Sequence, residues 1–391
     1  MVQPAAAIAG LGLTEVGKVY GRSATDFAAE AVRLAAQDAG LRLDDVDGLL
    51  VSYGLAHDIT LLLQNDLGLR DLRLLAEMNS YGASAGAMIS YAAMAVSAGM
   101  ADAVACVFAD ASRRPKGSSG EAYAAGRKHI LHGATGLRVV SGAGSPNVRY
   151  AMAARRHMEA YGTTSEQFGA IAVAQRQWAT MNPLAQMRAP LTLEEHQRSR
   201  WIAEPLRLYD CCLVSNGGAA VLVTSAARAA DLKQPPVHVL GFGQGHPGQL
   251  LERGWQFGLT SGAAVSGPTA LRMAGVTVAD VDVLELYDCY TYTVLITLED
   301  YGFCAKGEGG KFVAAGRTAP GGDLPVNTGG GQLSSYYLWG MTPVTEAVMQ
   351  ARGQAGERQV AHRDVIMVSG NGGILDHHST LVLSPHPRSA A

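Results

Sequence analysis

Charged residues are scarce in this chain. Asp, Glu, Lys and Arg make up 17% of its 391 residues, whereas hydrophobic residues make up 48%. The formal net charge is −3, and the sequence has neither a basic stripe nor an acidic tail. Nucleic-acid-binding proteins carry clustered positive charge, so nucleic acid is not expected as the main partner. A surface with so few charges favours burial of part of it against another subunit.

The chain also lacks the patterns of disulfide-rich, zinc-binding and membrane proteins. Its five cysteines (Cys106, Cys211, Cys212, Cys289 and Cys304) are odd in number and include no C-x-x-C pair. We therefore expect no metal site, and free thiols in a reducing compartment. No apolar run reaches the roughly 18 residues of a membrane helix, and the N-terminal segment has no basic region typical of a signal peptide. A cytoplasmic protein without membrane association is expected.

The pattern along the chain predicts two related halves. Short apolar runs alternate with helical patterns, which is typical of a layered α/β fold. Residues 35–50 resemble residues 269–285, and Asp45-Val46-Asp47 recurs as Asp280-Val281-Asp282, a shift of 235 positions (280 minus 45). Such agreement indicates an internal duplication. We predict one half over 1–234, with a loop insertion at about 112–165, and a second half over 235–391.

Several glycine-rich or tyrosine-rich segments lie at predicted strand ends, at 79–88, 210–223, 285–292 and 327–340. Taken singly, such a turn is required for packing more often than for a ligand. The first segment leads into an apolar helix, whose N-terminal N–H groups could stabilise an enolate or a thiolate. The third brings several phenols to one strand end, and a buried phenol needs a hydrogen-bond partner.

Three motifs resemble the thiolase superfamily: YGTTSEQFGAIAV at 161–173, NPLAQ at 182–186 and PLRLYDCCLVSNGGAAV at 205–221. They are most similar to the sterol-carrier-protein type, also called lipid-transfer-protein-like thiolases. The resemblance spans essentially the whole chain. It implies a thiolase fold, in which two duplicated α/β halves form a layered αβαβα arrangement with a loop domain inserted in the first half. It also implies an acyl-CoA substrate and a homodimer, and the apolar region 83–107 fits a buried interface.

The chain departs from this family at the catalytic motifs. Gly82 stands where the family has its nucleophilic cysteine, and Tyr337 stands at the histidine. The strand-end H-D-x-F motif becomes residues 287–290, Tyr-Asp-Cys-Tyr, and the terminal cysteine-glycine motif becomes residues 369–373, Ser-Gly-Asn-Gly-Gly. Thiolase chemistry needs a thiolate and a second acid or base, and glycine supplies neither. The protein is therefore not expected to be a working thiolase.

This pattern resembles the thiolase-like aldolases of steroid side-chain degradation, which work with a small OB-fold, zinc-ribbon partner subunit. The resemblance implies retro-aldol cleavage of a β-hydroxyacyl-CoA, such as a steroid side-chain thioester, to a ketone or aldehyde plus a short acyl-CoA. No cofactor beyond the coenzyme A thioester is implied. Tyr287 and Tyr337 are expected to face each other over Gly82 as acid and base, with a pKa lowered from about 10 by their neighbours. The missing cysteine side chain is expected to leave room for a branched substrate.

Further residues are expected to contact the substrate or its enolate: Gly82, Ser84, Asp288, Tyr290, His246, Ser369, Gly372 and Gly373. Backbone N–H groups near Gly82, or near Gly372 and Gly373, are candidate enolate donors. Two alternatives stay open. The protein could be a non-catalytic acyl-CoA-binding or lipid-binding subunit in which the tyrosines only fill space. It could also be an acyltransferase with Ser84 as nucleophile, although such a serine needs a nearby base.

Overall fold

The computed structural model describes residues 5–55, 58–117, 122, 133–248 and 253–387. Its main sheet has the strand order β3-β2-β4-β7-β1-β8-β11-β10-β9. The strands of the first group are β1 (Ala6–Leu13), β2 (Gly48–Tyr53), β3 (Leu74–Glu77), β4 (Ala103–Asp110) and β7 (Gly217–Ser225). Those of the second are β8 (Val237–Gly245), β9 (Val283–Glu285), β10 (Ile366–Gly372) and β11 (His377–Ser384). The groups meet where Ala7 and Ile8 of β1 pair with β8.

The two groups repeat one topology. In the first group, β1 is antiparallel to β7, β7 is antiparallel to β4, and β4 is parallel to β2. In the second group, β8, β11, β10 and β9 pair in the same order and with the same directions. Helices α1 (Ala24–Ala39) and α10 (Ala263–Ala274) end at left-handed glycines, Gly40 and Gly275. A 3₁₀ turn and then β2 or β9 follow each helix. The predicted duplication is confirmed for these elements, and the boundary between 234 and 235 stays a prediction.

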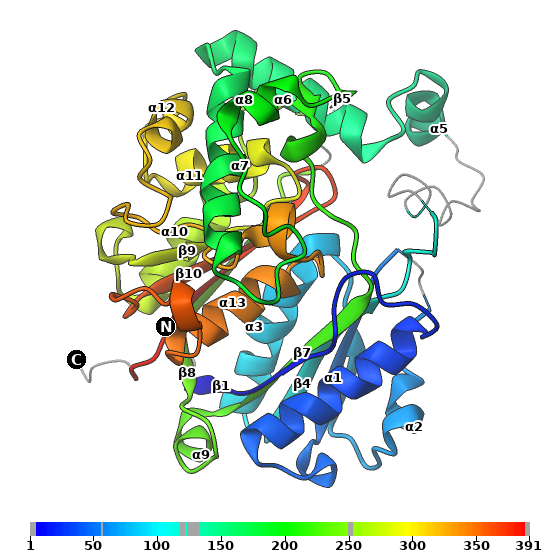
Figure 1. The fold of residues 1–391 in the computed structure, drawn as a ribbon. Helices are drawn as coiled ribbons and strands as arrows, with labels where there is room; N and C mark the ends of the chain where they lie inside the picture. Colours follow the sequence, from blue (N-terminus) through cyan, green and yellow to red (C-terminus); the bar gives the residue numbers. More distant parts are fainter. Residues whose placement is uncertain (1–4, 56–57, 118–121, 123–132, 249–252, 388–391) are drawn as a thin grey trace.

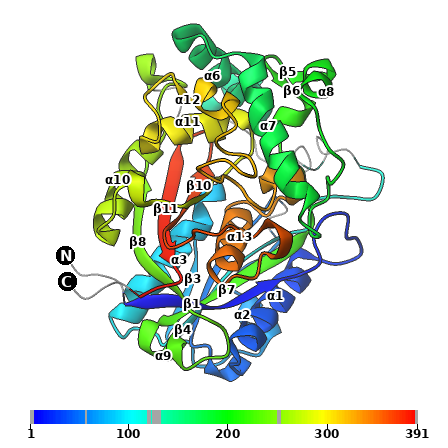
Figure 2. The same cartoon turned by 60° about the vertical axis from the view of Figure 1, so that its left-hand side comes forward.

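Helices and strands form five layers. Helix α1 covers the outer face of the first group of strands and α10 covers the second, while α3 (Ser84–Ser97) and α13 (Met341–Ala351) lie between the two groups (Figures 1 and 2). The predicted αβαβα arrangement is confirmed. Helix α3 packs on strands of both groups, so the chain itself buries most of the apolar residues after Gly82, whereas Met94 and Met100 are 48% and 43% exposed. The apolar composition of 83–107 is therefore largely explained by packing within the chain, and the dimer interface there stays a prediction.

The segment between β4 and β7 extends past residue 165. It contains α5 (Gly133–Val140), α6 (Pro146–Tyr161), α7 (Ser165–Thr180), α8 (Leu193–Arg198), β5 (Trp201–Ala203) and β6 (Leu206–Arg207). Part of the predicted insertion, residues 118–121 and 123–132, lies outside the described residues. Helix α7 packs on α11 (Thr291–Tyr301) and α12 (Gly309–Ala314) of the second half. The insertion thus covers the region where β9 ends.

The other helices that the structure describes are α2 (Leu63–Leu67) and α9 (Ala226–Ala230). Local sequence explains several boundaries. Ser23 and Asp26 form a capping box at the start of α1, as predicted, and Thr164 with Gln167 forms another at the start of α7. Among the described helices, none is both long and apolar enough to cross a membrane.

Candidate active site

Two buried tyrosines meet at the centre of the molecule. Tyr287 follows β9, and Tyr337 lies in the loop before α13. Their hydroxyl oxygens are 3.1 Å apart, and the residues are 4% and 7% exposed. The predicted juxtaposition of the two phenols is confirmed. A serine fixes the backbone at each one, because the Tyr287 N–H donates to Ser369 Oγ (2.9 Å) and the Tyr337 N–H donates to Ser215 Oγ (3.0 Å).

Gly82 lies directly against the ring of Tyr287. A Cβ atom built on Gly82 would be 2.2 Å from Tyr287 Cε2 and 2.3 Å from the carbonyl oxygen of Asn371. Atoms cannot approach so closely, so any side chain at position 82 requires the ring to move. The expectation that the missing cysteine leaves room for substrate is wrong, because the Tyr287 ring fills that space. The Tyr287 ring can therefore take its position only because residue 82 has no side chain.

Glycines surround the turn that carries Gly82. A Cβ on Gly372, at the end of β10, would lie 1.8 Å from the carbonyl oxygen of Ser80, and a Cβ on Gly340 would lie 2.3 Å from that of Gly82. Gly373 has φ +67°, which favours glycine. Ser84 is 2% exposed, and its Oγ accepts from the Ser80 N–H (2.8 Å). Among the described residues, no histidine hydrogen-bonds to Ser84, so the base that an acyltransferase would need is missing.

Asp288 ties the two tyrosine segments together. Its side chain is buried, and its carboxylate accepts from the Gln332 N–H (2.9 Å) and the Leu333 N–H (3.2 Å). These two residues lie in the turn Gly331–Ser335, which leads directly to Tyr337. Asp288 therefore holds the turn before Tyr337 in place, and its predicted contact with substrate stays a prediction. Burial raises its pKa to about 7, although the backbone N–H groups favour the carboxylate.

The insertion contributes a polar cluster that sequence reasoning missed. Tyr290 donates to Asn147 Oδ1 of α6 (2.5 Å), and its ring lies 4.5 Å from that of Tyr150. The Tyr150 hydroxyl accepts from Asn371 Nδ2 (2.8 Å), which links α6 to the end of β10. No motif marks Tyr150 or Asn147, because their role depends on how the insertion folds over the second half. Ser215 lies within a motif that the sequence singled out, but its partner was not evident.

His246 lies apart from this cluster. It follows β8 at the surface, and its ring nitrogens hydrogen-bond to His377 Nδ1 and Gln244 Oε1, both at 3.1 Å. His377 stacks on Tyr81, with ring centroids 6.4 Å apart. In the part of the chain that the structure describes, His246 has no hydrogen bond to either phenol. Its predicted contact with substrate stays a prediction.

Burial governs the protonation of the site. It raises the pKa of the Tyr287 phenol well above its usual value, and the hydrogen bond with Tyr337 opposes this only in part. The expectation that neighbours lower this pKa is therefore wrong, and Tyr287 is protonated at neutral pH. Burial also raises the pKa of the nearby Cys289 thiol to about 12, so this thiol is a poor nucleophile.

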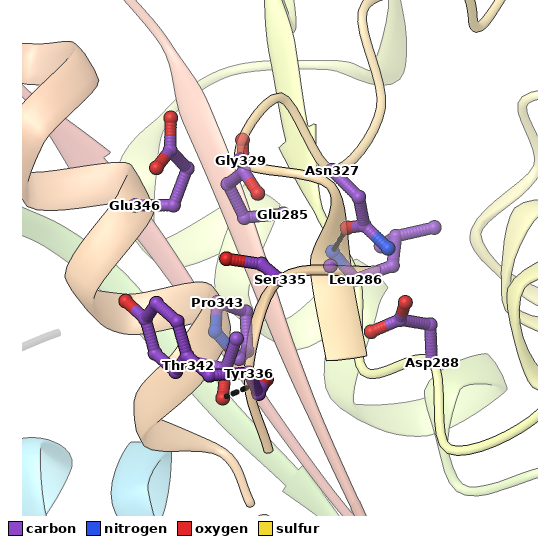
Figure 3. A pocket seen from close by; sticks show the side chains of 11 residues that line it. Glu285, Leu286, Asp288, Asn327, Gly329, Ser335, Tyr336, Thr342, Pro343 and Glu346 are labelled. Carbon is purple, nitrogen blue, oxygen red and sulfur yellow. Dashed lines mark hydrogen bonds between the residues drawn. The ribbon is translucent and has the colours of Figure 1, made fainter. Parts of the chain in front are cut away.

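A second polar cluster lies next to Asp288, at the end of β9. A small cavity of about 10 Å³, about the space of one water molecule, lies beside Glu285, Asp288, Ser335 and Glu346 (Figure 3). Glu346 accepts two hydrogen bonds from Arg358 (both 2.9 Å), and Thr328 Oγ1 donates to Glu285 Oε1 (2.7 Å). Burial and the neighbouring Glu346 raise the pKa of Glu285. The Arg358–Glu346 ion pair and the buried Glu285 therefore fix the end of β9.

The duplicated halves, the inserted helices, the glycine at the nucleophile position and the two phenols define a thiolase-type scaffold with an altered site. This chain belongs to the thiolase superfamily: it is 39% identical to a 17-hydroxy-3-oxo-4-pregnene-20-carboxyl-CoA lyase of Mycobacterium tuberculosis, over 95% of this chain and 98% of that protein. A steroid side-chain-cleaving aldolase of Thermomonospora curvata is 38% identical, over 94% and 95% of the two chains. Residues 243–385 match the family model "Thiolase C-terminal domain-like".

Solved structures agree with these sequence matches. An "Ltp2-ChsH2(DUF35) aldolase" is 36% identical, with a TM-score of 0.88 over 98% of both chains. A monomeric SCP2-thiolase like protein type 1 from Mycobacterium smegmatis is 20% identical, with a TM-score of 0.76 over 100% of this chain and 80% of that one. At that identity the second match shows the fold alone. The predicted family and fold are confirmed.

Proposed function

We propose that this protein is an acyl-CoA carbon–carbon lyase that cleaves a β-hydroxyacyl-CoA by a retro-aldol reaction. The observation that carries the proposal is the pair of hydrogen-bonded phenols, one at the strand-end motif and one at the thiolase histidine, that lies against Gly82 at the nucleophile position. A thiolase-type site without a thiolate cannot hold an acyl group covalently. Two full-length relatives named as a CoA lyase and a side-chain-cleaving aldolase support the same chemistry.

The reaction needs a proton to move from the β-hydroxyl to the α-carbon. One phenol oxygen takes the β-hydroxyl proton, the bond between the α- and β-carbons breaks, and the β-carbon becomes a carbonyl. The bonding electrons become the thioester enolate. The second phenol gives its proton to the α-carbon, and transfer across the 3.1 Å hydrogen bond restores both phenols. The products are a ketone or aldehyde and a shorter acyl-CoA, and no cofactor is consumed.

A relay of this kind suits phenols that are hard to ionise. Because burial raises the pKa of Tyr287, a free phenolate would be costly there. In the relay each phenol gains one proton as it loses another, so neither phenol has to carry a full charge. The tyrosines can thus serve as acid and base without the lowered pKa that a single base at neutral pH requires.

We assign the substrate to the steroid side-chain CoA thioesters. The names of the two relatives, a pregnene-carboxyl-CoA lyase and a steroid side-chain-cleaving aldolase, support this class. The similar structure named Ltp2-ChsH2(DUF35) aldolase supports a small partner subunit. None of the five cysteines, all of which lie within the described residues, forms a disulfide, which supports a reducing compartment such as the cytoplasm.

We also propose a homodimer. Strand β3 is an edge of the nine-stranded sheet, and Leu75 on it is 36% exposed. An unpaired edge strand is a template for pairing with a second chain. Light scattering at micromolar concentration tests this proposal, and a monomer there would contradict it.

Mass spectrometry of the products tests the function. The protein is incubated with a panel of β-hydroxyacyl-CoAs, including a steroid side-chain thioester, with and without the small partner subunit. We expect a carbonyl product and a shortened acyl-CoA in equal amounts, with no change in the intact mass of the protein. A stoichiometric acyl adduct on Ser84 or a cysteine would instead indicate a transferase. Tight binding without cleavage would favour a non-catalytic subunit.

A further inference from the structure

Two features of Trp339 are energetically unfavourable: its backbone conformation and its unpaired indole N–H. Trp339 lies two residues after Tyr337, and its backbone has φ +49°, a left-handed conformation that is unfavourable for a bulky residue. Its side chain is 6% exposed, and within the described residues its buried indole Nε1 has no hydrogen-bond partner. A buried donor left unpaired is destabilising, because it has lost its hydrogen bond to water without gaining another. Neither cost is explained by packing alone.

The surrounding residues hold Trp339 in this state. Gln332 Nε2 donates to the Trp339 carbonyl oxygen (2.7 Å), and the Gln332 N–H is itself bound by Asp288. The indole packs against Phe108, with ring centroids 5.1 Å apart, and against Tyr81 at 6.0 Å. Strain that neighbouring structure enforces in this way clusters at functional sites.

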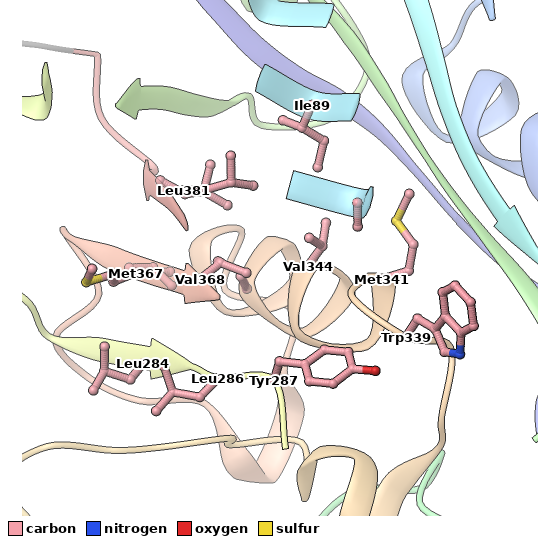
Figure 4. Packing of buried hydrophobic residues seen from close by; sticks show 14 of the residues in the cluster. Ile89, Leu284, Leu286, Tyr287, Trp339, Met341, Val344, Met367, Val368 and Leu381 are labelled. Atoms are coloured by element: carbon pink, nitrogen blue, oxygen red, sulfur yellow. The ribbon is translucent and has the colours of Figure 1, made fainter. Parts of the chain in front are cut away.

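The indole also packs next to the turn that carries Gly82. Tyr81 immediately precedes Gly82, the glycine that lies against the Tyr287 ring. Figure 4 shows the Tyr287 phenol extending toward the side on which Trp339 lies. A substrate whose β-hydroxyl meets the phenols has its thioester oxygen a few atoms away. An indole N–H can donate a hydrogen bond but does not ionise in this pH range, so it can stabilise an oxyanion without protonating it.

We propose that the Trp339 indole N–H donates a hydrogen bond to the thioester oxygen of the acyl-CoA, which carries the negative charge of the enolate. This assignment rests on the proposed lyase function, because the retro-aldol step makes this oxygen an enolate anion. The donor is fixed before substrate arrives, so it does not have to reorganise during the reaction. The unpaired N–H of the free protein gains its partner only when the thioester binds.

An isosteric replacement tests the role of the N–H. Trp339 is replaced by 3-benzothienylalanine, which keeps the fused ring and has sulfur in place of N–H, and Trp339→Phe is made alongside it. We expect kcat to fall by about 10²–10³-fold, as for loss of one oxyanion donor, with a much smaller change in KM. The matched control is Trp178, a buried tryptophan whose Nε1 donates to the Thr318 carbonyl oxygen (3.0 Å). The same replacement there should lower Tm and leave kcat unchanged.

Nuclear magnetic resonance separates this inference from the proposed function. The indole N–H signal of Trp339, assigned with Trp339→Phe, is followed during titration with acetyl-CoA and, as a control, with free coenzyme A. We expect a downfield proton shift with acetyl-CoA that free coenzyme A does not produce, because only the thioester has the acyl oxygen. Equal shifts with both ligands, or wild-type kcat in the benzothienylalanine variant, would overturn the inference while leaving the lyase intact. A selective shift without any cleavage would instead refute the lyase function alone.

Discussion

Each half of the molecule has a buried aspartate beside a strand end, at the end of β4 in the first half and after β9 in the second, but only one half carries the reacting groups. In the first half Asp110, at the end of β4, is buried and accepts from the Leu55 N–H and the Ser112 N–H, both at 3.1 Å. In the second half the buried Asp288 holds the 331–335 turn in a similar way. Burial raises the pKa of both carboxyls, to about 6 and about 7.

What differs is the side chain at the strand end. Under the shift of 235 positions, Ser52 of β2 is the equivalent of Tyr287 (287 minus 235). Ser52 is buried, and among the described residues no phenol hydrogen-bonds to its hydroxyl, whereas Tyr287 meets Tyr337. The duplicated scaffold therefore provides two sets of ordered strand ends, and the chemistry depends on side chains present in only one of them.

The largest effect is expected from the phenols themselves. Tyr287→Phe and Tyr337→Phe each remove one hydroxyl of the relay, so kcat should fall by about 10²–10⁴-fold while substrate affinity changes little. The double variant should be little worse than the poorer single one, because both groups act in one step. Steady-state kinetics checks this, with Tyr53→Phe at the corresponding strand end of the first half as a control. Wild-type rates in both single variants would refute the relay.

The next largest effect is expected from a single methyl group at the vacated nucleophile position. In Gly82→Ala the new Cβ would clash with the Tyr287 ring at 2.2 Å and with the Asn371 carbonyl oxygen at 2.3 Å. The ring must shift, so kcat should fall by at least about tenfold, and Tm should fall as well. In a Tyr287→Ala background the same change should cost less stability, because one of its two clashes is gone. Equal losses of Tm in both backgrounds would show that the ring is not the obstacle.

A smaller effect is expected from the two carboxylates, and it sharpens the comparison of the halves. Asp288→Asn places N–H groups opposite the Gln332 and Leu333 N–H donors, so the turn before Tyr337 should loosen. We expect kcat to fall by roughly tenfold, KM to change less, and little further loss in a Tyr337→Phe background. Asp110→Asn should lower Tm similarly without lowering kcat. A fall in kcat for Asp110→Asn as large as that for Asp288→Asn would mean that general destabilisation explains both.

The scaffold could be predicted from the sequence because its signals are local or repeated. The Asp-Val-Asp repeat, the capping box at Ser23 and the glycine at position 40 depend on near neighbours, and each has a counterpart in the structure. The meeting of Tyr287 and Tyr337 was predictable because both lie on motifs with known positions in the fold. The contacts made by the insertion could not be predicted, because Tyr150 and its partner Asn371 are 221 residues apart in the sequence. The raised pKa of Tyr287 depends on burial, which motif spacing does not report.

The smallest expected effect concerns the pH dependence of stability. A carboxyl whose folded-state pKa lies above its unfolded value near 3.8 binds its proton more tightly in the folded protein. The stability that this adds is fully present below about pH 3.8 and is lost as pH rises through the folded pKa. For Asp288 that loss should extend to about pH 7, and for Asp110 to about pH 6.

We therefore expect the wild-type Tm to fall between pH 5 and pH 8 more steeply than the Tm of Asp288→Asn, because the amide does not titrate. Asp110→Asn should flatten the same curve mainly below about pH 6, so the difference between the two variants should be largest from pH 6 to pH 7. Differential scanning calorimetry across this range checks both curves, and taking each variant against the wild type cancels the titration of the histidines. Parallel curves for the wild type and Asp288→Asn would show that this carboxyl ionises in the folded protein as readily as in the unfolded chain, and that its hydrogen bonds from the backbone fully offset its burial.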